Sequence, residues 1–328
     1  MKPGSFSVII PAYNEAGQIE ACLDSIRAGD AGDLLAEIIV VDNGSTDATV
    51  VLARGHGATV IENTSGKRLT ISRLRNLGAA RASGEVLAFL DADMLVPKEW
   101  LPSAREYFDG TFRGALGFVE TIPDDAGWVG KTWGNYVYLR PARATRVDYL
   151  TGRDLMVHRQ VFEQVGGFAE GLETDEDKEF TFRVVSAGFP ALIAPTPLVV
   201  HLGYERSLGE FIRKEYWRQN STLQLASRMR YSLRSLRHPL LSLWYLAGLA
   251  LLMVSLALRV PFLLLAGGGV QLLPTVAITL RKPGRRGAPP RFLLRYFVLC
   301  LIRWNVAGLA LAAQLVRRLS PKAGAGRR

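Results

Sequence analysis

Val86-Leu-Ala-Phe-Leu-Asp-Ala-Asp93 is an apolar run that ends in two carboxylates one residue apart. Its apolar part, Val86 to Leu90, predicts a buried strand. An extended backbone places side chains i and i+2 on the same side, so Asp91 and Asp93 can converge at the strand's carboxyl end. Oxygen ligands there suit Mg²⁺ or Mn²⁺, which complete their shell with substrate phosphates. For so short a pattern, a polar turn with solvated carboxylates is the alternative.

Alternating strand and helix patterns surround this stretch. Apolar or β-branched runs predict strands at 6–10, 37–41, 58–61 and 86–90, with helical patterns near 15–27, 47–54 and 70–82. This order predicts an α/β, Rossmann-like fold, with a mostly parallel sheet and helices on both faces. Ligands of such sheets bind at the carboxyl ends of the strands, so the residues that follow each strand are the candidate site.

Polar clusters follow three of these strands, at residues 11–15, 42–47 and 91–93. The first two also suit helix caps and turns, and a capped helix start offers backbone N–H groups to a phosphate. No G-x-G-x-x-G follows the first strand, and Ser65-Gly66-Lys67-Arg68 lacks the first glycine of a P-loop. Dehydrogenase and ATPase functions therefore lose their main support.

A fourth polar cluster, with acids at 175, 176, 177 and 179, lies where a helix is expected to start. Acidic residues in a first helical turn complement the helix dipole, which accounts for most of such clusters. Crowded like charges also raise the pKa of at least one carboxyl group, and this helps a carboxylate to act as a general base.

The net charge of +10 is unevenly spread, because residues 201–328 hold 21 of the 40 Lys and Arg residues but only 3 of the 30 Asp and Glu residues. The same half contains uncharged runs at 240–258 and 260–280 that are long enough to span a bilayer. Anionic membrane lipid is therefore a better partner for this half than nucleic acid. The Arg-rich segment 281–295 fits a cytoplasmic loop.

The sequence predicts a catalytic domain at 1–205, a basic amphipathic juxtamembrane segment at 206–238 and a helical membrane region at 239–328. A third apolar helix at 292–316 is interfacial or spanning, and the positive-inside bias favours two spans plus an interfacial helix. The amino terminus has no secretory h-region, and the two cysteines suggest neither a disulfide framework nor a zinc site. We therefore expect the catalytic domain on the cytoplasmic face of the inner membrane.

The motifs in this order resemble those of family 2 glycosyltransferases with the GT-A fold, of the membrane-anchored bacterial type. The matching segments are Val-Ile-Ile-Pro-Ala-Tyr-Asn-Glu (8–15), Ile-Ile-Val-Val-Asp-Asn-Gly-Ser-Thr-Asp (38–47), Arg-Asn-x-Gly (75–78), Phe-Leu-Asp-Ala-Asp (89–93), Val-Gly-Gly-Phe (165–168) and the acidic cluster 173–183, which is similar to Glu-Asp-x-Asp-Leu-x-x-Arg. The likeness covers about residues 5–205.

The resemblance implies a UDP- or GDP-type nucleotide-diphosphate sugar donor and a Mg²⁺ or Mn²⁺ cofactor. Donor binding would fall to Pro11, Tyr13, Glu15, Asp42, Ser45, Arg75 and Asp91, with Arg75 reaching the pyrophosphate. Asp93 would ligate the metal, with Asp91 nearby and His201 as a further ligand, although a strand-end histidine is more often a packed residue. Asp177 would be the base with Glu176 beside it.

Arg153 and Asp154, in Thr-Gly-Arg-Asp-Leu-Met-Val-His-Arg (151–159), occupy a stretch where relatives often show Gly-Gly-Asn, so the acceptor contacts stay open. Four aromatic residues either line an acceptor site or pack, namely Trp128, Trp133, Tyr136 and Tyr138. The leading function is inverting, metal-dependent transfer of a sugar to a lipid-linked or cell-envelope glycan acceptor. The alternatives are a polyprenyl-phosphate sugar synthase with the same donor site and an inactive membrane-bound GT-A scaffold.

Overall fold

The computed structural model describes the chain apart from residues 1, 30–33, 135–140, 230–232, 282–287 and 320–328. The chain divides into two compact units. The catalytic unit comprises residues 1–126 and 134–204, and the helical unit comprises residues 127–133 and 205–328. The helical unit thus includes a short segment, 127–133, that a linear division at residue 205 assigns to the catalytic domain.

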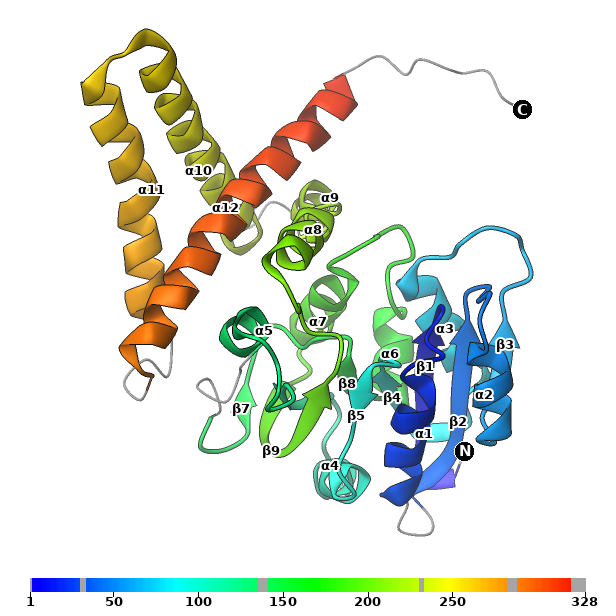
Figure 1. The fold of residues 1–328 in the computed structure, drawn as a ribbon. Helices are drawn as coiled ribbons and strands as arrows, with labels where there is room; N and C mark the ends of the chain where they lie inside the picture. The colour runs from blue at the N-terminus through cyan, green and yellow to red at the C-terminus, as the bar shows by residue number, and fades with distance from the viewer. Residues whose placement is uncertain (1, 30–33, 135–140, 230–232, 282–287, 320–328) are drawn as a thin grey trace. The chain divides into compact units, whose positions relative to one another are not determined.

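The catalytic unit alternates strands and helices in its first ninety residues, as the sequence predicts (Figure 1). Its elements are β1 (Lys2–Ala12), α1 (Ile19–Ala28), β2 (Leu35–Asp42), α2 (Thr49–Gly55), β3 (Thr59–Glu62), α3 (Ile71–Arg81), β4 (Gly84–Leu90), β5 (Met94–Leu95), α4 (Trp100–Phe108), β6 (Ala115–Thr121), β7 (Thr145–Arg146), β8 (Asp154–His158), α6 (Arg159–Val165), α7 (Glu176–Ser186) and β9 (Ala191–His201).

A single mixed sheet forms the centre of this unit, in the order β3-β2-β1-β4-β8-β6-β9-β5, with β7 on β9. Strands β1 to β4 pair in parallel, so their carboxyl ends share one edge. Strand β8 runs antiparallel between β4 and β6. This insertion brings the residues before β8 to the same edge as those after β4, since Leu90 pairs with Asp154.

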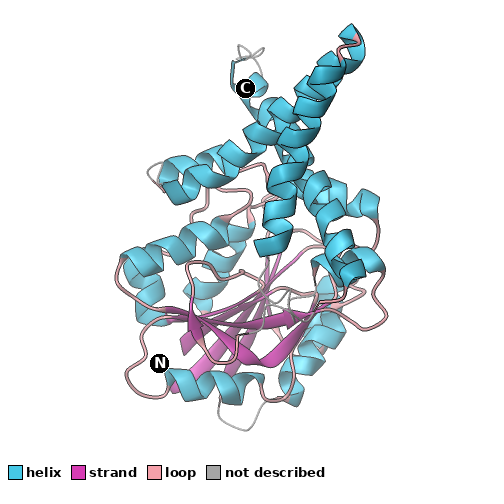
Figure 2. Cartoon of the chain, turned by 90° about the vertical axis from the view of Figure 1, so that its left-hand side faces the viewer, coloured by secondary structure: helices cyan, strands magenta, loops and turns pink. Residues whose placement is uncertain are grey.

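Helices cover both faces of the sheet (Figure 2), and the buried side chains fall into two cores. One core lies against α1, α2 and α4, and the other against α3, α6 and α7. The helices contribute to these cores because their apolar residues recur at the spacing of one helical face. In α1 the buried residues are Ile19, Cys22, Leu23 and Ile26. The predicted α/β fold class, with a mostly parallel sheet, helices on both faces and apolar helices after it, is confirmed.

The helical unit contains α5 (Trp128–Trp133), α8 (Leu208–Arg218), α9 (Thr222–Arg228), α10 (Leu233–Leu258), α11 (Pro261–Arg281) and α12 (Pro290–Leu319). The last three helices are long and apolar enough to cross a membrane. Many of their large apolar side chains are exposed, including Phe262, Leu265 and Leu273, each more than 70% exposed. Such surfaces are typical of helices that face lipid.

Polar groups inside this unit pair with one another. Gln271 of α11 and Asn305 of α12 exchange two side-chain hydrogen bonds of 2.9 and 2.8 Å, and the Tyr245 hydroxyl lies 2.7 Å from that of Thr275. The Glu215 carboxylate of α8, which is 1% exposed, contacts Arg218 and Arg303. These pairs join α8, α10, α11 and α12 to each other.

Candidate active site

The loops after β1 and β2 are joined by hydrogen bonds between side chains and backbone. The Asn14 N–H donates to Ser45 Oγ, and the Asn14 side-chain oxygen accepts from the Thr46 N–H, both at 2.8 Å. Asp42, which is 2% exposed, accepts from the Gly44 and Ser45 N–H groups through Oδ2 at 2.9 Å. Asp42 Oδ1 is buried and has no hydrogen-bond partner among the described residues. The predicted donor residues of these two loops therefore lie together.

Three further predicted donor residues lie at the end of β1. Pro11 is buried within the strand, and the Arg68 guanidinium lies 3.4 Å from the centre of the Tyr13 ring. The Glu15 N–H donates to Thr49 Oγ1 at 2.8 Å. Burial, followed by the charges of Asp93 and Asp91, raises the pKa of Glu15 to about 7. Negative charge is thus concentrated at this edge of the sheet.

Arg75 links the turn after β4, which carries Asp91 and Asp93, to helix α7. Its side chain is 1% exposed and donates to Asp91 Oδ1 at 2.9 Å and to Glu176 Oε1 at 2.7 Å. Gly152 makes this possible, since a Cβ there would lie 2.5 Å from the guanidinium. The guanidinium contacts two protein carboxylates, and the pyrophosphate contact that the resemblance implies stays a prediction. The structure places the guanidinium between Asp91, which follows β4, and Glu176, at the start of α7.

The rest of the Arg-Asn-x-Gly motif also holds distant segments together. The Asn76 side chain exchanges hydrogen bonds of 2.9 Å with the backbone N–H and carbonyl of Phe168. Gly78 packs on β1, where a Cβ would lie 2.3 Å from Ile9. The motif therefore fixes α3 against β1 and against the Val-Gly-Gly-Phe segment that precedes α7.

Two of the three predicted metal ligands come together. His201 Nε2 lies 3.4 Å from Asp93 Oδ2, whereas Asp91 is turned to Arg75. Burial opposes the ionisation of Asp93, but the hydrogen bond and charge of His201 and the charge of Arg153 hold its pKa below the ordinary value.

The Asp93–His201 pair fits a divalent cation. Asp93 Oδ1 is buried without a hydrogen-bond partner among the described residues, and a Cβ at Gly203 would lie 1.9 Å from Asp93 Oδ2. Carboxylate oxygen and neutral imidazole are ligands that Mn²⁺ accepts. Within the described ranges no three His, Cys, Asp or Glu side chains group as a complete metal site. A cation here would therefore take further ligands from a substrate or water.

The start of α7 gives each of its four acids a different partner. Asp175 pairs with Lys178, Glu176 with Arg75 and Glu179 with Arg183. Asp177 instead accepts from the Tyr149 hydroxyl and the Gly152 N–H, both at 3.1 Å. Burial, followed by the charge of Asp177 and against the charge of Arg75, raises the pKa of Glu176 to about 7. Asp177 thus accepts from two neutral groups, whereas each of the other three acids pairs with a cation.

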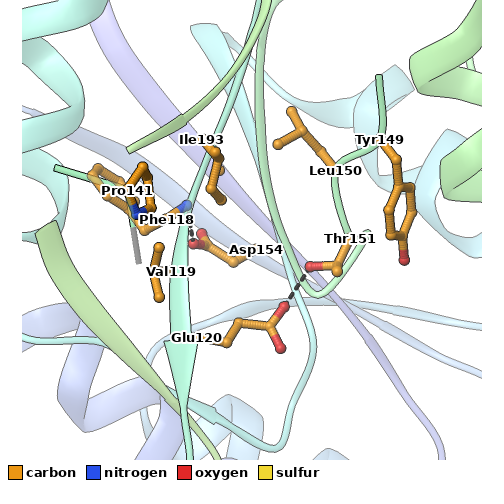
Figure 3. Close-up of a pocket in the computed structure, with 10 residues that line it drawn as sticks. Phe118, Val119, Glu120, Pro141, Tyr149, Leu150, Thr151, Asp154 and Ile193 are labelled. Carbon is orange, nitrogen blue, oxygen red and sulfur yellow. Dashed lines mark hydrogen bonds between the residues drawn. The ribbon is translucent and has the colours of Figure 1, made fainter. Parts of the chain in front are cut away.

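Glu120, at the end of β6, is a site residue that the sequence analysis missed. It is 7% exposed and accepts from Thr151 Oγ1 at 2.5 Å and from Arg153 at 2.6 and 3.1 Å (Figure 3 shows the Thr151 bond). Burial opposes ionisation, but Arg153 and the hydrogen bonds lower the pKa of Glu120. The stretch that departs from Gly-Gly-Asn thus supplies the partners of a buried acid, through Arg153 and the nearby Thr151.

Two of the four aromatic residues considered for an acceptor site belong to the helical unit. The Trp133 ring packs on Phe211 and Tyr296 with centroid distances of 5.1 and 6.1 Å, and Trp128 lies near Arg295. Tyr136 and Tyr138 lie outside the described residues. For Trp133, packing is therefore the role that the contacts show.

Comparison with known proteins assigns the family. The family model described as glycosyl transferase family 2 matches residues 7–166. The chain is 30% identical over 248 residues to glycosyltransferase AglE of Haloferax volcanii, covering 74% of this chain and 80% of that protein. The chain belongs to glycosyltransferase family 2. This family 2 enzyme is also 28% identical over 200 residues to a poly(ribitol-phosphate) beta-N-acetylglucosaminyltransferase, TarS of Staphylococcus aureus, covering 54% of this chain and 32% of that one.

Solved structures show the same GT-A fold. The mannosyltransferase PcManGT from Pyrobaculum calidifontis, in complex with GDP-Man and Mn²⁺, aligns with a TM-score of 0.60 at 20% identity over 96% of this chain and 88% of that one. Residues 1–349 of S. aureus TarS, in complex with UDP-GlcNAc, align with a TM-score of 0.51 at 17% identity over 90% of each chain.

Proposed function

We propose that this glycosyltransferase is inverting and metal-dependent, and that it transfers a sugar from a nucleotide-diphosphate sugar to a lipid-linked or cell-envelope glycan acceptor. The observation that carries the proposal is the double ion pair of Arg75. It joins Asp91, beside the Asp93–His201 pair, to Glu176, beside Asp177. Donor, cation and base positions thereby belong to one connected site.

The donor would lie along the carboxyl ends of β1, β2 and β4. Asp42, Ser45 and the Tyr13 ring would contact the base and ribose, as in the resemblance. Asp93 and His201 would hold Mg²⁺ or Mn²⁺, and such an ion stabilises the charge that develops on a departing diphosphate. GDP-Man and Mn²⁺ in PcManGT support this donor class and cofactor. Arg75 would position Asp91 and Glu176 in place of a pyrophosphate contact.

Asp177 would act as the general base. The acceptor hydroxyl oxygen attacks the anomeric carbon, its proton passes to Asp177, and the bond from that carbon to the nucleoside diphosphate breaks. This single displacement inverts the anomeric centre. The hydrogen bonds from Tyr149 and Gly152 fix the carboxylate in place, which a base needs in order to reach the proton.

The catalytic unit would face the cytoplasm from the inner membrane. Basic residues are concentrated in the helical half, and anionic lipid attracts such segments. Helix α12 would lie at the interface, since Arg303 at its centre pairs with Glu215 of α8 and Leu299 packs with Val129 and Phe211. Helices α10 and α11 would then be the two spans.

Calorimetric titration of the full chain with UDP- and GDP-sugars, with and without Mn²⁺, tests the proposal. We expect one nucleotide class to bind only in the presence of the metal. Incubation of the radiolabelled donor with extracted membrane lipid should then label a lipid product. Absence of metal-dependent binding for every nucleotide sugar would contradict the proposal and favour an inactive scaffold.

A further inference from the structure

A cavity of about 160 Å³ lies in the catalytic unit between β6, β9 and the segment that precedes β8 (Figure 3). We call it the β6–β9 cavity. The residues that line it are Gly117, Phe118, Val119, Glu120, Pro141, Tyr149, Leu150, Thr151, Asp154 and Ile193. Gly117 adds to its space, because a Cβ there would lie 3.1 Å from Leu150 and 3.7 Å from Ile193.

The carboxylates that border the cavity are already engaged by the protein. Asp154 accepts from the Trp100 indole and from the Phe118 N–H, both at 3.0 Å. Glu120 accepts from Thr151 and Arg153. What the cavity offers to a ligand is therefore mainly hydrocarbon from Val119, Leu150 and Ile193. Such walls bind an apolar group by removing it from water.

The cavity borders the proposed base. Tyr149 is one of the residues that line it, and the Tyr149 hydroxyl donates to Asp177 at 3.1 Å. Thr151 lines it next to Gly152, whose N–H also donates to Asp177. The predicted donor residues lie elsewhere in the unit, after β1, β2 and β4 and, for Arg75, on α3. The position next to Asp177 is where an acceptor hydroxyl must sit if Asp177 removes its proton.

We propose that the β6–β9 cavity binds an apolar group of the acceptor, adjacent to the hydroxyl that receives the sugar. The assignment rests on the proposed function. An apolar cavity of about 150 Å³ accommodates benzene, so this one suits about six to eight carbons. An aromatic ring and an isoprenoid unit share this chemistry. The acceptor would then carry an apolar hydrocarbon group next to the hydroxyl that attacks the sugar.

Photolabelling of the full chain in detergent with 3-trifluoromethyl-3-phenyldiazirine, followed by peptide mapping, tests the cavity without requiring turnover. We expect label on peptides that contain Val119, Leu150 or Ile193, as well as on the exposed apolar helices α10 and α11. Ile193→Phe fills the cavity and should reduce the cavity label about tenfold, whereas the label on α10 and α11 stays constant. Ile193→Val leaves the cavity open and should keep the label.

Val119→Phe provides a second filled variant, and metal-dependent donor binding checks that each variant is folded. Benzyl alcohol and 3-methyl-2-buten-1-ol serve as competitors, and the one that protects the cavity peptides identifies the aromatic or the isoprenoid source. Three outcomes would each overturn the assignment. The cavity of a donor-binding chain takes up no label, both filled variants keep undiminished label, or neither alcohol protects the cavity peptides. A labelled chain that binds no donor would instead contradict the proposed function.

Discussion

The two units differ in how their buried side chains are partnered. Both contain buried polar atoms without a hydrogen bond among the described residues, but in the helical unit Glu215 Oε2 faces Arg303 at 3.2 Å as an ion pair. In the helical unit, Gln271 and Asn305 satisfy each other, and Glu215 lies between two arginines. At the edge of the catalytic sheet, one oxygen each of Asp42 and Asp93 is buried without a hydrogen-bond partner among the described residues. An unsatisfied buried polar atom costs about 1–3 kcal/mol. The paired groups are thus suited to hold helices together, and the unpaired ones to bind a ligand.

Among the variants of the catalytic unit, we expect the largest loss of activity at Asp177. Replacing Asp177 by Asn removes the proposed base but keeps its size, so kcat should fall about 10²- to 10⁴-fold. Calorimetric donor affinity should stay unchanged, because Asp177 lies outside the predicted donor contacts. Asp175→Asn, which alters only the neighbour that pairs with Lys178, is the control. Activity that survives in Asp177→Asn would point to a phosphate acceptor, which needs no base, and hence to a polyprenyl-phosphate sugar synthase.

Asp93→Asn tests whether the unpaired oxygen awaits a cation. The loss of one charged ligand should lower metal-dependent turnover about 10²- to 10³-fold, comparable to the loss of a group that stabilises transition-state charge. The thermal unfolding midpoint should stay near that of the wild type. Asp124→Asn, an exposed aspartate in the loop after β6, serves as the matched control. Equal losses of folding and activity would favour a purely structural role for Asp93.

Arg75→Lys tests whether the side chain at position 75 must contact Asp91 and Glu176 at the same time. Lysine keeps the charge but cannot donate in two fixed directions, so kcat should fall about 10- to 100-fold, as for other groups that orient ligands. Donor affinity should change little. Arg73→Lys, an exposed position on the same helix, is the control. A large loss of donor affinity with kcat retained would support a pyrophosphate contact instead.

The pH dependence of kcat should report Glu176. Its pKa is about 7, so above pH 7 it carries the charge that pairs with Arg75, and below pH 7 it takes up a proton and the ion pair is lost. Activity should therefore decline as the pH falls through about 7. In Glu176→Gln the part of this decline that comes from the ion pair should disappear, whereas Glu15, whose pKa is also about 7, titrates in both proteins. An identical acidic limb in both proteins would assign the titration to another group.

The smallest effect is expected in the helical unit. Gln271→Leu and Asn305→Leu should each lower stability in detergent by about 1 kcal/mol, and the double variant by less than the sum. Metal-dependent donor binding should be unaffected. Additive losses would show that the two side chains do not act as a pair, and loss of donor binding would show that the units are coupled.

Many strands and helices of the catalytic unit could be predicted from the sequence, because each has a local pattern of apolar and polar residues. The runs before Pro11, Asp42 and Asp91 form strands that end where the polar residues begin. Glu120 follows an apolar run in the same way, so the same rule applied to β6 identifies it. The hydrogen-bond and ion-pair partners of these residues could not be predicted from the sequence. Arg75 and Glu176 are 101 positions apart, and their contact depends on Gly152 leaving room for the guanidinium.

The sequence by itself determined the alternating α/β order, the polar residues at the strand ends and the long apolar helices, because each follows from periodicity within a short window. Tertiary structure decided which acid pairs with which cation, left Asp93 beside His201, and placed 127–133 in the helical unit. The Asp93–His201 contact depends on β5 pairing with β9, which sets Met94 opposite His201. That neighbourhood arises from packing between distant segments, which no local pattern records.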